Sequence, residues 1–144
     1  MARYTTSFFS PRSPDDAWRF LSDIRLFSTW DPGVAASVQV KGDGPVVGAA
    51  YDLTIRGAMT TVMRYVVVER GERRLKMIST TAWLRSVDEL SVEPEGDGAK
   101  VTYDAVLTLN GPLRVLDPLL AIAFRRIGDR ADVGLRQALG AVPR

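Results

Sequence analysis

The stretch that decides the fold lies near the end of the chain, at residues 117–139, and has the sequence DPLLAIAFRRIGDRADVGLRQAL. Its apolar side chains recur at steps of three and four residues, which predicts a helix with one apolar face. That face consists of Leu120, Ala123, Phe124, Ile127, Ala131, Leu135 and Ala138. Asp117 suits the N-cap, Pro118 suits the first helical position, and residues 113–116 are expected to form a preliminary helical turn. Such a helix would be roughly 33 Å long, so the rest of the chain must supply a broad surface to cover it.

Upstream of this helix, apolar and polar residues alternate in a way that predicts strands joined by short turns. The predicted strands span residues 3–10, 34–41, 49–56, 60–69, 74–81, 83–93 and 100–109. Because short turns join consecutive strands, we expect an antiparallel meander with one apolar face. The long helix is available to cover that face.

Two short helices are expected between the first two strands. Ser13 begins the first, where a proline and two acids follow it, and this helix ends near Ser22. Asp23 caps the second, which ends at the Asp-Pro-Gly break of residues 31–33. The order of elements therefore predicts one α+β domain spanning residues 1–144.

Composition narrows the possible functions. Apolar residues make up 46% of the chain and charged residues 25%, which is ordinary for a globular domain. The chain contains neither cysteine nor histidine, which excludes Ser-His-Asp and Cys-His nucleophile systems and the usual Cys/His zinc sites. It also lacks a glycine-rich phosphate-binding loop, so we expect neither a metal nor a cofactor.

Location and partners follow from charge and hydropathy. No apolar run approaches the roughly 18 residues that a membrane span requires, and the N-terminus lacks the apolar core of a signal peptide. We therefore expect a cytoplasmic protein without a membrane span. The 19 Lys and Arg residues stand against 17 Asp and Glu without a dense basic run, so we expect no nucleic-acid partner. Either a monomer or a homodimer fits the sequence.

Several landmark residues follow one another in a particular order. After the first strand comes the segment 13–23, then Trp30 before the break, then Gly48, then Val101-Thr102-Tyr103, and finally the helix entry at 117–120. In this order and spacing the chain resembles the START / birch-pollen-allergen superfamily. Within it, the chain is most similar to the polyketide cyclase/dehydrase-like proteins of the SRPBCC group, and the resemblance covers nearly the whole chain.

This resemblance implies the helix-grip fold, in which a curved seven-stranded antiparallel sheet wraps around a long C-terminal helix. It also implies a cavity between sheet and helix, in which members hold lipids, steroids, polyketides or other apolar molecules. It supplies no universal catalytic motif, so candidate site residues must come from the pattern of this chain.

Asp88 is the most informative polar residue. Leu90 and Val92 are expected to face the helix, so period-two counting places Asp88 and Ser86 on the same concave face. A carboxylate on an apolar face needs a partner or a raised pKa, and such groups mark functional sites more often than chance. The alternative is a bulge or a frayed strand end that turns Asp88 to solvent.

Aromatic residues supply further candidates. Tyr51, Tyr65 and Tyr103 lie in the middle of strands, where an inward hydroxyl could orient a ligand. The alternative is the ordinary preference of tyrosine for strands. Trp30 either packs in the core or closes the mouth of the cavity.

The facing of Arg64 and the role of three methionines remain open. Arg64 is expected to face solvent, and the alternative is a buried cation that awaits an acidic partner. Met59, Met63 and Met77 either line an adaptable cavity or fill the core. Taken together, the candidate ligand-binding residues are Trp30, Tyr51, Tyr65, Met77, Asp88, Tyr103 and Phe124.

Three hypotheses of function follow. The first is a cavity protein that binds a small hydrophobic or amphipathic molecule, lipid-, steroid- or polyketide-like. The second is a polyketide aromatase/cyclase or dehydratase-type enzyme with Asp88 as general base and Tyr103 as acid or oxyanion donor. The third is a non-catalytic partner or stress-associated domain whose cavity is filled by side chains.

Overall fold

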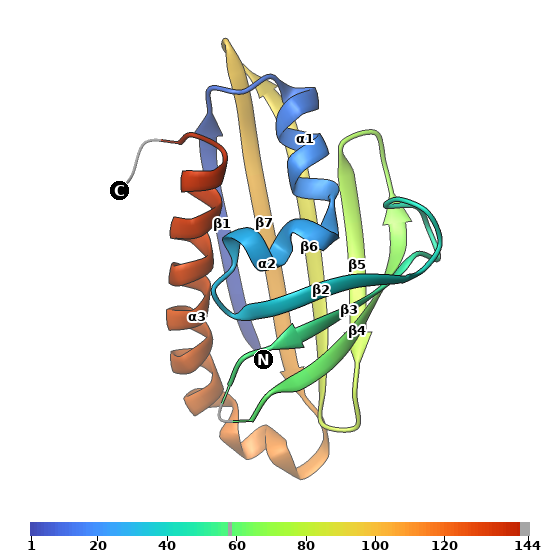
Figure 1. Ribbon diagram of the computed structural model, residues 1–144. Coiled ribbons are helices and arrows are strands. Elements are labelled where there is room, and N and C mark those ends of the chain that lie inside the picture. The colour runs from blue at the N-terminus through green and yellow to red at the C-terminus, as the bar shows by residue number, and fades with distance from the viewer. Residues whose placement is uncertain (58, 142–144) are drawn as a thin grey trace.

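The computed structural model describes residues 1–57 and 59–141, and the elements follow the predicted order (Figure 1). Each predicted strand is present, with ends within two residues of those expected. The elements are β1 (Ala2–Ser10), α1 (Pro14–Ser22), the 3₁₀ helix η1 (Ile24–Leu26), α2 (Phe27–Trp30), β2 (Val34–Lys41), β3 (Ala50–Ile55), β4 (Thr61–Arg70), β5 (Arg74–Thr80), β6 (Leu84–Glu95), β7 (Gly98–Leu109), the 3₁₀ helix η2 (Gly111–Leu116) and α3 (Asp117–Ala138).

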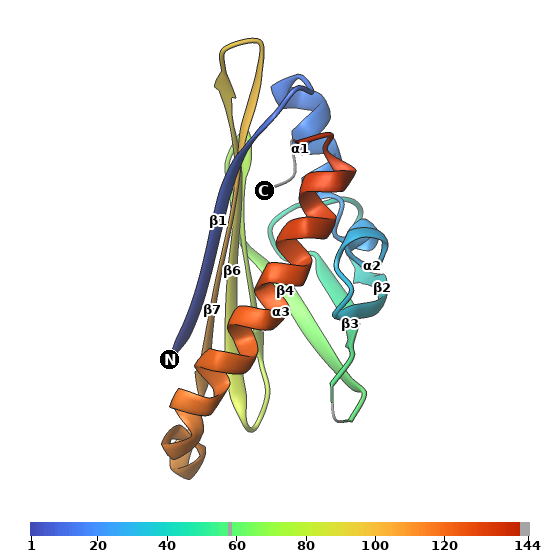
Figure 2. The same cartoon turned by 90° about the vertical axis from the view of Figure 1, so that its left-hand side faces the viewer.

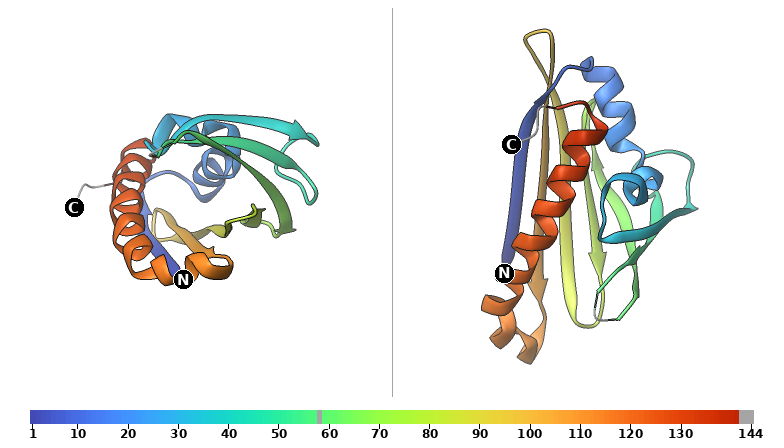
Figure 3. Two further views of the ribbon diagram at one scale, coloured as in Figure 1. Left: turned by 90° about the horizontal axis from the view of Figure 1, so that it is seen from below. Right: turned by 60° about the vertical axis from the view of Figure 1, so that its left-hand side comes forward.

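The seven strands form one antiparallel sheet in the order β1-β7-β6-β5-β4-β3-β2. Consecutive strands from β2 to β7 are neighbours, and β1 joins the sheet beside β7. Register shifts in β2 and β4 mark bulges, which bend strands and increase their twist. The sheet accordingly curves strongly, and α3 lies across its open side (Figure 3). This confirms the predicted curved sheet around a long C-terminal helix.

The short helices begin as their sequences predict. Ser13 caps α1, since its Oγ accepts a hydrogen bond from the Asp16 amide at 3.2 Å. Asp23 caps η1 by accepting from the Arg25 amide, also at 3.2 Å. Both helices contribute to the core, which is a cluster of apolar side chains from the helices and the concave face of the sheet. Its fully buried members include Leu21, Ile24, Phe27, Tyr51, Leu75, Met77, Leu90, Val101 and Leu135.

Alongside β1, α3 runs in the same direction and is joined to it by side-chain hydrogen bonds (Figure 2). Tyr4 donates to Asp129 at 2.7 Å, and the buried Thr6 donates to Asp132 at 2.5 Å. Near the end of the helix, Ser10 donates to the carbonyl oxygen of residue 139 at 2.7 Å. The alternate residues of β1 that face inward therefore position α3 along its length.

Two glycines let α3 come close to its neighbours. A Cβ at Gly134 would overlap the carbonyl oxygen of Trp30 at the end of α2. A Cβ at Gly128 would overlap the ring of Tyr4 in β1. The helix therefore touches β1 and α2 at once and closes the curved sheet between them.

The start of α3 differs from the expectation. Asp117 is not the N-cap, because η2 runs directly into α3 and residue 117 already has helical dihedral angles. Its carboxylate instead accepts a hydrogen bond from the N-terminal ammonium of Met1 at 2.6 Å. The preliminary turn expected at 113–116 is present within η2.

The apolar face of α3 is covered only toward its C-terminal end. Leu135 is 1% exposed, whereas Ile127 is 46% exposed and Ala123 is also exposed. The prediction of one fully covered stripe is therefore wrong for the first half of the helix, because the sheet does not pack against it there. No helix within the described residues is long and apolar enough to cross a membrane.

We predict that Gly134→Ala lowers the free energy of unfolding by about 1–3 kcal/mol, because the added methyl group meets the rigid backbone of α2. Urea unfolding measures this value. The exposed Val133→Ala in the same turn is the control and should change stability by less than about 0.5 kcal/mol. At an unconstrained helical position, alanine would instead stabilise by up to about 1 kcal/mol, and that result would refute the close approach.

Candidate functional site

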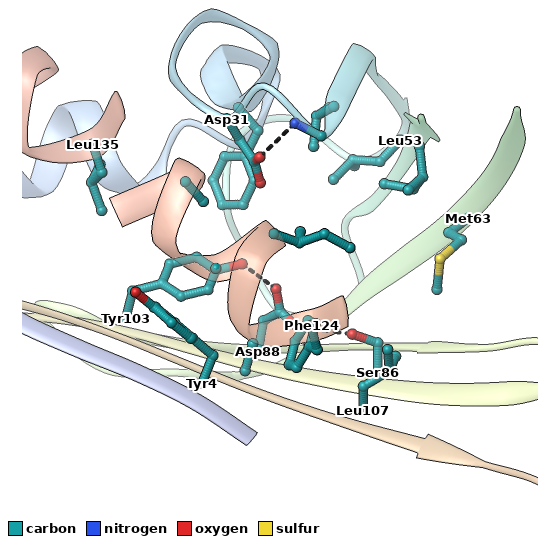
Figure 4. A pocket seen from close by; sticks show the side chains of 18 of the residues that line it. Tyr4, Asp31, Leu53, Met63, Ser86, Asp88, Tyr103, Leu107, Phe124 and Leu135 are labelled. Atoms are coloured by element: carbon teal, nitrogen blue, oxygen red, sulfur yellow. Dashed lines mark hydrogen bonds between the residues drawn. The ribbon is translucent and has the colours of Figure 1, made fainter. Parts of the chain in front are cut away.

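A cavity of about 200 Å³ lies between the concave face of the sheet, the end of α2 and α3 (Figure 4). Most of its wall is apolar, which is typical of sites for small hydrophobic molecules. The apolar lining residues are Phe27, Trp30, Val34, Leu53, Ile55, Met63, Leu84, Ala105, Leu107, Phe124, Ile127, Ala131 and Leu135. The tyrosine and polar lining residues are Tyr4, Thr6, Asp31, Arg56, Tyr65, Ser86, Asp88, Tyr103 and Asp132.

The sheet side of the cavity carries a chain of hydrogen bonds that ends on Asp88. Tyr65 on β4 donates to the Ser86 hydroxyl at 3.0 Å, and Ser86 donates to Asp88 Oδ1 at 3.0 Å. Tyr103 on β7 donates to the other carboxylate oxygen of Asp88. Asp88 is only 5% exposed, so it lies on the concave face, as period-two counting predicted. The bulge that would have turned it to solvent is absent between β6 and its two neighbouring strands.

Burial changes the proton affinity of this group. Removal of Asp88 from water raises its pKa from the ordinary value of 3.8 to about 6, even though the hydrogen bonds from Tyr103 and Ser86 lower it. Burial, together with the nearby Asp88 charge, also raises the pKa of Tyr65 and Tyr103 well above the usual range for a phenol. Both tyrosines therefore remain hydrogen-bond donors at neutral pH.

A second carboxylate faces the cavity from the opposite side. Asp31, immediately after α2, points toward the space above Asp88 (Figure 4). Its Oδ1 accepts a hydrogen bond from the Gly33 amide at 2.8 Å. Burial raises the pKa of Asp31, and this amide bond lowers it in part.

The third carboxylate in the wall is already paired. Asp132 on α3 accepts from Thr6 and from Arg136 Nε, the latter at 2.9 Å. This ion pair is well shielded from water, because Asp132 is buried and the Arg136 guanidinium lies over the Phe8 ring at 4.8 Å. The ion pair lies within α3 and contacts β1 through Thr6 and Phe8, with its charge compensated within the protein.

An aromatic group closes the α2 side of the cavity. The Trp30 and Tyr103 rings meet nearly edge to face, with centroids 5.9 Å apart, and the Phe27 ring lies 4.8 Å from Trp30. Trp30 is buried, and its indole nitrogen has no hydrogen-bond partner among the described residues. Trp30 thus contributes apolar surface to the cavity, and its buried indole N–H is left without a partner among the described residues.

The structure brings most of the sequence candidates together. Trp30, Tyr65, Asp88, Tyr103 and Phe124 all line the cavity. Tyr51 and Met77 do not line it. Both point inward from their strands, but they lie in the packed core with side chains of the short helices, such as Leu21 and Ile24.

The structure also shows where the arginine and methionine candidates lie. Arg64 faces outward and forms a two-point contact with Asp52 across β3 and β4, at 2.7 and 3.0 Å. Met63 lines the cavity, whereas Met59 is exposed.

Sequence reasoning missed Asp31 and Asp132. It treated Asp31 only as part of a helix break and assigned no functional role to Asp132. The available signal for Asp132 was its spacing of four residues from Gly128 and three from Leu135, which places all three on one helical face.

Comparison with known proteins supports this architecture. Residues 1–140 match the family described as polyketide cyclase / dehydrase and lipid transport. A START superfamily protein from Mycobacterium smegmatis has a TM-score of 0.80 and 13% identity, over 97% of this chain and 98% of that chain. The protein TTHA0849 from Thermus thermophilus has a TM-score of 0.75 and 16% identity, over 95% and 96% of the two chains.

A third similar structure is the di-domain ARO/CYC StfQ from the steffimycin biosynthetic pathway. Its TM-score is 0.65 at 14% identity, and the match covers 97% of this chain and 52% of that chain. At these identities the likeness concerns the fold alone, and it confirms the predicted helix-grip arrangement. No curated protein matches the chain in sequence.

We predict that Asp88 makes the protein less stable as pH rises from about 4 to about 6. In this range the folded protein holds the Asp88 proton more often than the unfolded chain does, so rising pH favours unfolding. The shift corresponds to roughly 3 kcal/mol, and Asp88→Asn should remove that part of the pH dependence. Urea unfolding of both proteins at several pH values measures the difference.

The matched control is Asp52→Asn on the outer face. Arg64 lowers the pKa of Asp52 through their hydrogen bonds, so its contribution has the opposite sign and is lost as pH falls. The effect should be small because the pair is exposed to solvent. If the stability of the wild type and of Asp88→Asn changed equally between about pH 4 and about pH 6, that result would contradict the burial of the Asp88 carboxylate.

Proposed function

Because this chain belongs to the family described as polyketide cyclase / dehydrase and lipid transport, we propose that it binds a small hydrophobic or amphipathic molecule between the sheet and α3. The molecule would be lipid-, steroid- or polyketide-like. The observation that carries the proposal is the cavity of about 200 Å³. Its wall is largely apolar and contains one hydrogen-bonded network of polar side chains on the sheet side.

The hydrophobic effect can supply the affinity. A ligand that buries about 150 Å² of apolar surface gains roughly 4 kcal/mol before the cost of association is subtracted. Contacts with side chains such as Leu107, Phe124 and Ile127 would contribute this term. The polar groups contribute less to affinity than to orientation, because a ligand atom must match the fixed positions of Asp88 and Ser86.

The proposal requires no metal, cofactor or nucleic acid. It fits a cytoplasmic protein that acts as a monomer or a homodimer. A cavity filled by its own side chains is the competing description, and the space enclosed by the lining residues argues against it.

An enzyme of the aromatase/cyclase or dehydratase type is the second candidate, favoured by the contact between Tyr103 and Asp88. With a pKa of about 6, Asp88 is mostly ionised at neutral pH and can accept a proton from a bound substrate. While Asp88 is ionised, Tyr103 keeps its proton and donates a hydrogen bond to Asp88. Tyr103 can therefore donate to a substrate oxygen only when this bond is broken, for example after Asp88 has been protonated.

One variant distinguishes the binding function from the enzymatic function. In an enzyme that uses Asp88 as general base, Asp88→Asn should abolish turnover of a polyketide-like chain while the chain still binds. Asp52→Asn on the outer face should leave turnover unchanged. Full turnover by Asp88→Asn would exclude this mechanism.

Native mass spectrometry of the protein as purified tests the binding function directly. We expect a non-covalent adduct that is lost on denaturation and is recovered by organic extraction as an apolar compound. A bare chain, together with no thermal shift across a panel of lipids and aromatic polyketides, would contradict the proposal.

A cavity-filling substitution tests where the ligand binds. We predict that Ala131→Trp weakens binding of the neutral probe 2-naphthalenemethanol by at least about tenfold, because the indole occupies the space beside Ala131. Ala121→Trp on the exposed side of the same helix is the control and should bind as the wild type does. Titration of naphthalene fluorescence or calorimetry measures both. Equal affinity in the two variants would place the ligand outside the cavity.

A further inference from the structure

We propose that the ligand presents a hydrogen-bond donor, preferably a cationic amine, to the two facing carboxylates Asp88 and Asp31. This inference rests on the proposed binding function and specifies the chemical class of its ligand. Amphiphiles with a basic nitrogen are favoured, neutral alcohols are tolerated, and carboxylic acids are disfavoured.

The charges around the cavity are unequal. Three carboxylates line it, and Arg136 compensates only Asp132. Among the described lining residues, Arg56 is the single cation, and its exposed side chain donates to the carbonyl oxygen of residue 32 at 2.9 Å. Within residues 1–57 and 59–141, neither Asp31 nor Asp88 forms a salt bridge.

The hydrogen bonds leave acceptors open. An ionised carboxylate offers about four lone-pair positions, and Asp88 uses one for Ser86 and one for Tyr103. Asp31 uses one for the Gly33 amide. The hydroxyl protons of Tyr65, Ser86 and Tyr103 are already donated. Among the buried lining groups described, the indole N–H of Trp30 is a donor without a partner, and the exposed Arg56 keeps further N–H groups. The open positions on Asp31 and Asp88 themselves are all acceptors.

Figure 4 shows the two acids on two sides of the same pocket. Asp88 rises from the sheet, and Asp31 points into the same space from the side of α2. A ligand that fills this space also displaces water, so neither carboxylate would retain its hydration. An ionised carboxylate without water or a partner is costly, and a donor or cation on the ligand removes that cost.

The expected discrimination is large. A charge on the ligand interacts more strongly with a carboxylate in this partly buried site than it would in water, because the effective dielectric constant is lower there. The interaction attracts an ammonium group and repels a carboxylate. Dehydration of the ligand charge offsets part of this interaction. We therefore expect the affinity to rise by about tenfold from the carboxylic acid to the alcohol, and by about tenfold again from the alcohol to the amine.

Three probes with the same ring system test the inference. They are 2-naphthylmethylamine, 2-naphthalenemethanol and 2-naphthoate, titrated into the full chain at pH 7.5. We expect the amine to bind about tenfold more tightly than the alcohol, and naphthoate to bind most weakly. Equal affinities, or tighter binding of naphthoate than of the alcohol, would overturn the inference and leave the proposed binding function standing. If none of the three bound, the binding function would fail for molecules of this size, and the inference with it.

Variants assign the preference to the named residues. Asp88→Asn and Asp31→Asn should each reduce the preference for the amine over the alcohol by about three- to tenfold. Binding of the alcohol should change little, which shows that each variant still folds around its cavity. Asp52→Asn removes a carboxylate from the outer face and should leave the preference unchanged. An unchanged preference in both cavity variants would overturn the assignment.

Discussion

The close attachment of α3 to β1 and α2 is the constraint on which the rest of the structure depends. A strongly curved sheet has an open side, and α3 closes it by meeting β1 at Gly128 and the end of α2 at Gly134. The buried contact between Thr6 and Asp132 fixes the helix between these two points. Because the helix is held by its neighbours at the rim, the middle of the concave face is left uncovered, and the cavity lies there.

Inside that cavity, stability and function make opposite demands on Asp88. A buried carboxylate costs free energy, and the hydrogen bonds from Ser86 and Tyr103 offset only part of the cost. A wall made only of apolar side chains would be more stable and would bind any molecule of suitable size. The uncompensated acids Asp31 and Asp88 give the proposed binding site a polarity, and therefore a means to select among apolar molecules.

Sequence periodicity was sufficient to predict the helices and strands and to place Asp88 on the concave face. The reason is that the alternation of side chains along a strand depends only on local geometry. Periodicity could not distinguish two positions on the same face. Tyr51 and Tyr65 are opposite each other in neighbouring strands, yet only Tyr65 reaches the cavity, while Tyr51 is packed in the core. The pairing of Thr6 with Asp132 joins residues 126 positions apart, which no local pattern encodes. Asp117 was misplaced because η2 continues directly into α3.

The central claim is that a small apolar molecule binds between the sheet and α3, beside Asp88. Isotope-filtered NOE spectroscopy on methyl-labelled protein with unlabelled 2-naphthylmethylamine tests this most directly. The account predicts contacts from the naphthalene ring to the methyl groups of Leu53, Leu107 and Ile127, and none to the exposed Ile122. Contacts confined to Ile122 or other surface methyl groups would show that the molecule binds outside the cavity and would contradict the account.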